Sequence, residues 1–300
     1  MKFISFINPS GLQRAGWLQE DGVVDMSLAH AQLPIDMLSF LQDYEVNIEI
    51  IKNSVNQDAH YPLDKVQLIA PIPNPNSFRD FIAFETHLKN ATARFGDPVP
   101  DVWYEMPIFY FSNHSSFKGD KENIKRPSKC QKLDFELEIA CIISKNGMNI
   151  KAEEAEEYIA GYSILNDWTA RDIQAQEMKC MLGPAKGKDF ATSLGKYIVT
   201  KDELEPFRIA NNRFDMPMKA YINGKLVSDG NFKDIHFTFG QMIERASEDT
   251  MLFAGDVIGS GTVGWGCLME SGATIHTWLE PEDEVLLIIE GLGTLQNKIV

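Results

Sequence analysis

Alternation between apolar and polar positions is clearest in the segment LDFELEIACII, residues 133–143. Every second residue from Phe135 to Cys141 is apolar and falls on one face of a predicted strand, whereas Glu136 and Glu138 fall on the other. Residues 140 and 142 make that second face apolar again. The pattern fits a half-exposed antiparallel strand with a wet acidic side. It also fits a divalent cation held between the two carboxylates, and the two glutamates alone do not decide between these readings.

The pattern of apolar and polar residues also divides the chain into two predicted domains. The first 65 residues combine short apolar runs with an amphipathic stretch at 34–55, which predicts strands with one or two helices. The segment APIPNPNSF, residues 70–78, carries three prolines and is typical of a boundary. We therefore predict a small N-terminal α/β domain over residues 1–68 and a larger domain over residues 69–300.

The larger domain is predicted to be mainly β, so the fold class is α+β. Asn223-Gly224 between two alternating runs predicts a hairpin with a type I′ turn, and the last 18 residues predict further strands. Helices are predicted over 85–96 and 151–161, ending at Gly96 and Gly161, and over 238–249.

Composition excludes some functions. The 300 residues are 44% hydrophobic, enough for a substantial core, and the net charge of −15 disfavours binding to nucleic acid or anionic membranes. No apolar run reaches membrane-spanning length, and the opening MKFISFINPSG lacks the core of a signal peptide, so a cytoplasmic location is expected. The four cysteines form no C-x-x-C pair, and we expect reduced thiols.

A second informative stretch is YSILNDWTARDIQAQEMKCMLGPAKGKDF, residues 162–190. An apolar strand runs directly into Asp167, where a carboxylate at a strand end can reach a cavity. The alternative is that Asp167 caps the N-terminus of a helix that begins at residue 168. Taken alone, Arg171 and Lys188 would be solvated surface cations.

Together with LDFELEIA, the segments GYSILNDWTARDIQ and LGPAKGKDFATSLGKYIVTKDEL resemble the fumarylacetoacetate hydrolase family from about residue 71 to the C-terminus. The resemblance implies a mixed β-roll for the larger domain. It also implies a divalent cation, bound by four carboxylates, with Asp134 outside the ligand set: Asp80, Glu136, Glu138 and Asp167. An all-oxygen set of this kind suits Mg²⁺, the ion we expect first, or Mn²⁺ or Ca²⁺, better than Zn²⁺.

The resemblance further implies a group that activates water. His87 would be the general base, oriented by Glu270, and Lys188 would be a catalytic cation. Without the resemblance, His87 reads as a packing or surface residue. The substrate would be contacted by four further side chains: Arg171, Gln174, Tyr110 and Thr262.

These features predict a metal-dependent hydrolase that cleaves a carbon–carbon bond in a small anionic β-diketo acid, either fumarylacetoacetate or a related acylpyruvate. The resemblance places such an enzyme in tyrosine degradation and implies a homodimer. The rival within the same family is a hydratase, isomerase or decarboxylase of 2-oxo dicarboxylic acids from aromatic catabolism. Because those enzymes use the metal site without the complete histidine–glutamate pair, the presence of His87 and Glu270 favours hydrolysis.

One motif points to a different chemistry. GSGTVG places Gly259, Gly261 and Gly264 in the G-x-G-x-x-G order of a dinucleotide-binding loop. The residues that follow have no helical period, so these glycines are better read as tight turns beside the active site than as an NAD site. A non-enzymatic Ca²⁺-binding module would need neither His87 with Glu270 nor Lys188.

Overall fold

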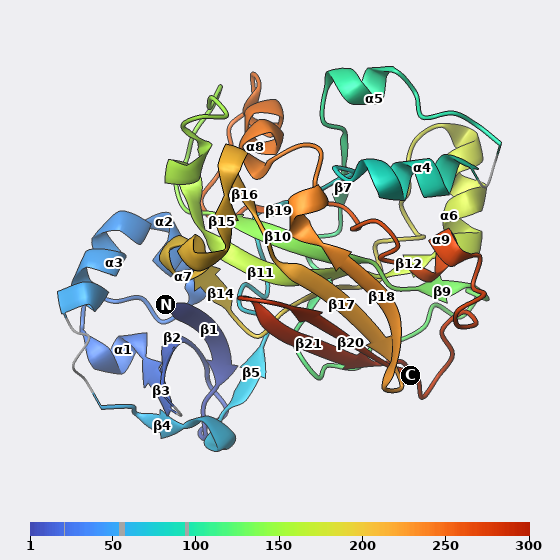
Figure 1. Cartoon of the computed structure of the whole chain (residues 1–300). Coiled ribbons are helices and arrows are strands. Elements are labelled where there is room, and N and C mark those ends of the chain that lie inside the picture. Colours follow the sequence, from blue (N-terminus) through green and yellow to red (C-terminus); the bar gives the residue numbers. More distant parts are fainter. Residues whose placement is uncertain (21, 54–57, 94–95) are drawn as a thin grey trace.

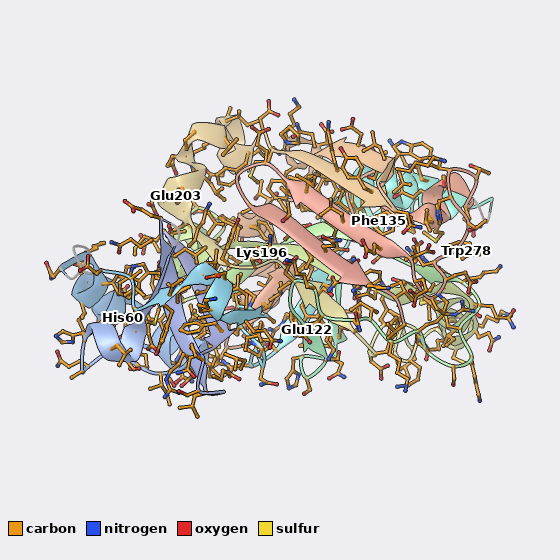
Figure 2. The ribbon with its side chains drawn as sticks, turned by 90° about the horizontal axis from the view of Figure 1, so that it is seen from below. His60, Glu122, Phe135, Lys196, Glu203 and Trp278 are labelled. Carbon is orange, nitrogen blue, oxygen red and sulfur yellow. The ribbon has the colours of Figure 1, made fainter. Side chains whose placement is uncertain are left out.

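The computed structural model describes residues 1–20, 22–53, 58–93 and 96–300. Sheets form the frame of the molecule and the described helices are short, which confirms the predicted α+β, mainly β class. Figure 1 shows the N-terminal segment, in blue, on one side of the molecule, and the helices α4, α5, α6 and α9 at the opposite end. Figure 2 shows the same separation from below, with His60 in the N-terminal segment and Trp278 at the far end.

The N-terminal segment forms one end of the largest sheet. Its strands are β1 (Lys2–Ile7), β2 (Gln13–Gln19), β3 (Gly22–Asp25), β4 (Tyr61–Pro62) and β5 (Gln67–Ile69). Its helices are α1 (Met26–Ala29), α2 (Met37–Gln42) and α3 (Tyr44–Asn53). The amphipathic stretch predicted at 34–55 thus forms two helices, and its residues 54–55 lie outside the described chain. The division into domains 1–68 and 69–300 stays a prediction.

Among the described residues, the largest sheet has thirteen strands and continues from the N-terminal segment into the rest of the chain. Ten of them follow the order β4-β3-β2-β1-β14-β11-β10-β19-β6-β7, whereas β5, β8 and β13 lie off this path. Strand β1 connects the two parts because it pairs with β14, with Lys2 opposite Val199. The strands not yet given are β6 (Phe78–Phe81), β7 (Phe109–Ser112), β8 (Phe117–Lys118), β10 (Leu137–Ile143), β11 (Ile159–Asp167), β13 (Thr192–Leu194), β14 (Ile198–Thr200) and β19 (Val257–Gly259).

A second sheet of four strands lies in front of β10 and β11 in Figure 1, in the order β18-β17-β20-β21. Its strands are β17 (Pro217–Ile222), β18 (Lys225–Asn231), β20 (Glu284–Ile289) and β21 (Gly293–Lys298). Asn223 and Gly224 have φ values of 51° and 79°, and Ile222 pairs with Lys225, so the predicted two-residue hairpin is confirmed. Two small ribbons pair β9 (Leu133–Asp134) with β12 (Thr169–Ala170) and β15 (Arg208–Ile209) with β16 (Arg213–Phe214).

The helices outside the N-terminal segment are α4 (Glu85–Ala93), α5 (Val102–Glu105), α6 (Arg171–Glu177), α7 (Lys201–Leu204), α8 (Phe239–Ser247) and α9 (Leu268–Ser271). Short 3₁₀ turns span Leu63–Lys65, Ala155–Tyr158, Met178–Cys180, Glu205–Phe207, Ala210–Asn212 and Phe232–Asp234. The predictions over 85–96 and 238–249 correspond to α4 and α8, and residues 94–95 lie outside the described chain.

The helix predicted over 151–161 is wrong. Only the 3₁₀ turn at 155–158 forms there, and Gly161 lies inside β11 rather than at a helix end. A Cβ on Gly161 would come within 2.2 Å of the carbonyl oxygen of Val199 on the neighbouring strand. Burial of the apolar run that begins at Ile159 therefore outweighs the helix propensity of the acidic residues before it.

Strand β10 separates the two halves of the core, as its alternation predicts. Leu137, Ile139 and Cys141 belong to the cluster that also holds buried residues of β17 and β20. Ala140 and Ile142 belong to the cluster formed with the N-terminal segment. Both faces of β10 are thus covered, and each fully buried aliphatic side chain contributes roughly 1.5–3 kcal/mol.

All four cysteines carry free thiols, as expected, and three of them are buried. Among the described residues, no helix combines the length and the apolar character needed to cross a membrane.

Candidate functional site

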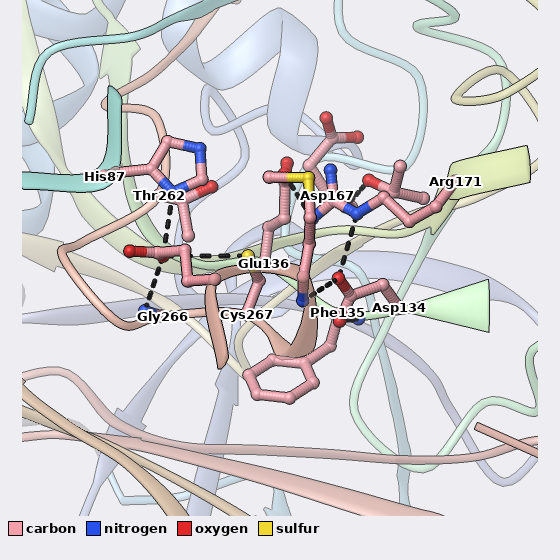
Figure 3. A network of polar contacts seen from close by, with 12 residues as sticks. His87, Asp134, Phe135, Glu136, Asp167, Arg171, Thr262, Gly266 and Cys267 are labelled. Carbon is pink, nitrogen blue, oxygen red and sulfur yellow. Dashed lines mark hydrogen bonds and ion pairs between the residues drawn. The ribbon is translucent and has the colours of Figure 1, made fainter. Parts of the chain in front are cut away.

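The four predicted ligand carboxylates come together where β10 begins. Asp80 lies on β6, Asp167 ends β11, Glu136 immediately precedes β10, and Glu138 is the second residue of β10. All four are buried. Oxygens of Asp80, Glu136 and Asp167 lie within 4.8 Å of one another, and Figure 3 shows Glu136 and Asp167 facing the same space. The helix cap proposed as an alternative for Asp167 does not form, because α6 begins only at Arg171.

Three oxygens of this cluster have no hydrogen-bond partner in the structure, although they are buried: Asp80 Oδ1, Glu138 Oε2 and Asp167 Oδ1. An unpaired buried carboxylate oxygen carries a large desolvation cost. Hard divalent cations bind such oxygens and offset that cost. The donor set therefore fits Mg²⁺, Mn²⁺ or Ca²⁺. Glu138 lies outside the closest group of three, and its other oxygen accepts a hydrogen bond from Thr262 at 3.2 Å.

Charge in the cluster is only partly balanced. Burial, and after it repulsion by Asp167, raises the pKa of Asp80 well above its ordinary value. Burial and repulsion by Asp80 do the same to the pKa of Glu138. Glu136 behaves differently: burial works to raise its pKa, but the nearby cations Lys188 and Arg171 outweigh burial and lower the pKa to about 2. Four carboxylates thus face two cations.

Lys188 lies between two of the carboxylates. Its Nζ donates to Asp167 Oδ2 at 2.7 Å and forms a second ion pair with Glu136. Burial works to lower the pKa of Lys188, but attraction by these carboxylates outweighs it, so the pKa is raised and the ammonium stays charged. Tyr110 donates from its hydroxyl to Asp167 and, at 3.3 Å, to Asp80.

His87 and Glu270 form the predicted pair. His87 lies in the first turn of α4, and its Nδ1 is 2.8 Å from Glu270 Oε1 (Figure 3). Glu270 also accepts from Asn90 Nδ2 at 2.7 Å and from the backbone N–H groups of Trp265 and Gly266 at 2.7 and 3.1 Å. Burial works to raise the pKa of Glu270, but these hydrogen bonds, led by that from His87, outweigh it and lower the pKa. Glu270 is therefore an anion that holds the imidazole in place.

Cys267 lies beside this pair, with Sγ 3.6 Å from Glu270 Oε1. His87, Cys267 and Glu270 therefore form a second group of three side chains whose potential metal-ligand atoms lie close together. Unlike the carboxylate cluster, this trio has both Glu270 oxygens engaged by hydrogen bonds. The structure therefore supports a hydrogen-bonded pair here rather than a metal site.

Two residues predicted to contact the substrate, Arg171 and Gln174, interact with other side chains of the protein. Arg171 donates from Nε to Asp134 at 2.8 Å, and its Nη2 is 2.8 Å from Glu136. Gln174 accepts from Arg171 Nη1 at 3.3 Å. Asn90, which the sequence reading missed, lies three residues after His87 on the same helix, and that spacing could have revealed it.

The glycines of GSGTVG make room for the segments that carry the site. A Cβ on Gly259 would lie 2.3 Å from Asp80 Oδ1, and one on Gly261 would lie 2.2 Å from the carbonyl oxygen of Phe81. A Cβ on Gly264 would lie 2.7 Å from Cβ of Thr86, the residue next to His87. These glycines therefore allow neighbouring segments to approach the backbone closely beside the site. The next helix, α9, begins only at Leu268 and has four residues.

Comparison with known proteins gives the same family throughout. The family model described as the fumarylacetoacetate (FAA) hydrolase C-terminal domain matches residues 76–300. Fumarylacetoacetase of Arabidopsis thaliana is 29% identical over 82% of this chain and 74% of its own length. The mitochondrial oxaloacetate tautomerase fahd2 of Xenopus laevis is 29% identical over 100% of this chain and 89% of its own.

Solved structures agree on the fold. Fumarylacetoacetate hydrolase from Exiguobacterium antarcticum is 26% identical, with a TM-score of 0.75 over 100% of this chain and 99% of that one. Maleylpyruvate hydrolase from Sphingobium sp. SYK-6, in complex with manganese(II) and pyruvate, is 21% identical with the same TM-score and coverage. At that identity it supports the fold alone. By its family model, its relatives and its fold, the chain belongs to the fumarylacetoacetate hydrolase family of enzymes.

Proposed function

We propose that this enzyme is a divalent-metal-dependent hydrolase that cleaves a carbon–carbon bond in a small anionic β-diketo acid, such as fumarylacetoacetate or another acylpyruvate. The observation that supports hydrolysis is the His87–Glu270 pair, which lies beside the carboxylate cluster with Nδ1 and Oε1 2.8 Å apart. Such a pair provides a general base for water, which hydrolysis requires.

Asp80, Glu136, Glu138 and Asp167 would hold the cation, with Mg²⁺ as the first candidate and Mn²⁺ or Ca²⁺ as alternatives. The unpaired buried oxygens of this cluster support that assignment. When bound, a divalent cation polarises a carbonyl oxygen and stabilises negative charge on the substrate. Manganese(II) and pyruvate in the Sphingobium maleylpyruvate hydrolase are consistent with a 2-oxo acid as the metal-binding end of the substrate.

The chain's own residues would move the proton. Because Glu270 contacts Nδ1 of His87, Nε2 is the nitrogen that can take a proton from water. The anionic Glu270 stabilises the imidazolium that results. Lys188 and Arg171 would attract the negative charges of the substrate, while Gln174, Tyr110 and Thr262 would offer hydrogen bonds to it.

A second candidate is tautomerisation of a 2-oxo acid, favoured by the Xenopus oxaloacetate tautomerase, whose match covers 100% of this chain and 89% of the tautomerase. In that reaction His87 would carry a proton between carbon and oxygen, and no water would be added. The two candidates need the same metal cluster and the same base, so only the products distinguish them.

Product analysis tests the proposal. Protein treated with EDTA should be inactive on fumarylacetoacetate and on simple acylpyruvates, and Mg²⁺ or Mn²⁺ should restore the release of two carboxylic fragments. Oxaloacetate serves as the comparison substrate. Tautomerisation of oxaloacetate without cleavage of any diketo acid would contradict hydrolysis, and full activity of the EDTA-treated protein would contradict the metal.

We also propose that the enzyme is a homodimer in the cytoplasm that takes part in tyrosine degradation. A monomer mass by light scattering at micromolar concentration would contradict the dimer.

A further inference from the structure

Asp134 is a buried carboxylate beside the site that the proposed chemistry does not use. It has no exposed surface, ends β9, and precedes the proposed ligands Glu136 and Glu138 in the chain. Its side chain accepts four hydrogen bonds, and Figure 3 shows it between Arg171 and the segment that carries Cys267. A carboxylate so fully bonded is not available to a metal ion.

One set of these bonds fixes helix α9. Asp134 Oδ1 accepts the backbone N–H of Leu268 at 2.8 Å, and Oδ2 accepts that of Met269 at 3.0 Å. These are the first two N–H groups of α9, and the helix has no side-chain cap of its own, because Cys267 stands at the capping position. Asp134 therefore supplies the cap from more than 130 residues away. The next residue of α9 is Glu270, the partner of His87.

The other bond fixes the metal side of the site. Arg171 donates from Nε to Asp134 at 2.8 Å, and the same guanidinium reaches Glu136 at 2.8 Å through Nη2. A guanidinium is rigid and planar, so fixing Nε also fixes the direction of Nη2. The contact with Glu136 is an ion pair and not a hydrogen bond, so Asp134 sets, through Arg171, where positive charge faces this proposed ligand.

We infer that Asp134 is a positioning residue that joins the two halves of the active site, setting Glu270 against His87 through α9 and Glu136 against the metal through Arg171. This inference rests on the proposed function for the roles of Glu270 and Glu136. It assigns Asp134 no contact with substrate or metal. Its consequence is that one substitution outside both groups weakens metal binding and proton transfer together.

Asp134→Asn tests the inference, since the amide keeps the shape but turns an NH₂ group toward donors. Metal affinity, measured by titration calorimetry with Mn²⁺, should fall about 10–100-fold, the usual effect of losing a group that orients a ligand. The value of kcat at saturating Mn²⁺ should also fall, with KM changing much less. In a Glu270→Gln background, Asp134→Asn should lower kcat much less than it does alone, because both changes act through the same helix.

Asp25→Asn is the matched control. Asp25 is also buried, also caps a four-residue helix, α1, and also faces an arginine, with Arg14 Nε 3.8 Å from Oδ2, but it lies in the N-terminal segment. This control should lose stability while keeping Mn²⁺ affinity and kcat. If Asp134→Asn behaves in the same way, with lower thermal stability alone, Asp134 is only a structural residue and the inference is overturned.

Arg171→Lys keeps the inference testable if Asp134→Asn does not fold. A lysine keeps the charge but cannot hydrogen-bond Asp134 and face Glu136 in the fixed geometry of a guanidinium. Mn²⁺ affinity should fall about tenfold, and an unchanged affinity would refute the metal arm of the inference. Failure of the wild-type protein to bind Mn²⁺ would instead refute the proposed function, so the two failures are distinguishable.

Discussion

Replacing Lys188 with methionine should destabilise the metal-free protein strongly. Lys188 is 4% exposed and holds Glu136 and Asp167 together, with Nζ 2.7 Å from Asp167 Oδ2. Methionine has a similar length but no charge, so Lys188→Met leaves buried Asp167 without its cation and Glu136 with Arg171 alone. Breaking a buried ion pair by removing one partner costs roughly 3–5 kcal/mol. For a chain of this size that corresponds to a fall in Tm of about 6–20 °C.

A divalent cation should reverse much of this loss, because it supplies positive charge to the same carboxylates. Thermal unfolding at pH 7, in EDTA and with Mg²⁺ or Mn²⁺ added, measures both effects. The metal-induced rise in Tm should be larger in Lys188→Met than in the wild-type protein. Binding of a ligand to the folded state raises stability by mass action, so the rise should also depend on metal concentration.

Lys186→Met is the control for this experiment. Lys186 lies two residues earlier, but its side chain is 74% exposed and pairs with Asp189 near the surface. Surface ion pairs contribute about 0–1 kcal/mol, so Tm should hardly change. If Lys188→Met unfolds at the wild-type temperature in EDTA, or responds to metal as the wild-type protein does, the charge balance derived for the cluster is wrong.

Three further predictions follow from the same geometry. His87→Ala should lower kcat roughly 10²–10⁴-fold and leave Mn²⁺ affinity unchanged, as steady-state kinetics and calorimetry would show. Gly259→Ala should weaken Mn²⁺ binding, because its Cβ would lie 2.3 Å from Asp80 Oδ1; equal affinity would mean that Asp80 is not a ligand. In metal-free protein the folded state holds protons on Asp80 and Glu138 that the unfolded chain has already released, because both folded pKa values are raised. Its free energy of unfolding should therefore fall as the pH rises from about 4 through those raised values, and saturating Mg²⁺ should remove this dependence; urea titrations across pH with no such slope would contradict it.

The sequence predicted the parts of the fold that depend on local pattern. The alternation over residues 135–142 placed each side chain of β10 on its correct face, and Asn223-Gly224 fixed the hairpin because few other dipeptides adopt two positive φ values. The helix predicted at 151–161 failed because pairing of β11 with its neighbours is a long-range effect, absent from a local window.

The candidate site shows the same limit. Motif resemblance selected the four acidic residues and the His87–Glu270 pair, and the structure brings them to one place. The role of Asp134 could not be predicted, because it depends on a contact with a segment more than 130 residues away in the chain. The spacing of Asn90 from His87 could have selected Asn90 as a candidate, but its contact with Glu270 spans 180 residues. Asp134 is close in sequence to the proposed ligands Glu136 and Glu138, yet its side chain accepts hydrogen bonds from the backbone of α9.

Turnover in ¹⁸O-labelled water tests the central claim most directly. The metal-loaded enzyme would be supplied with an acylpyruvate in H₂¹⁸O, and both products would be analysed by mass spectrometry immediately after cleavage, with the His87→Ala variant as the control. Hydrolysis predicts one ¹⁸O atom in the newly formed carboxylate of a single fragment, at a rate that falls with the loss of His87. An intact carbon skeleton, or release of CO₂ without label in a new carboxylate, would contradict the account.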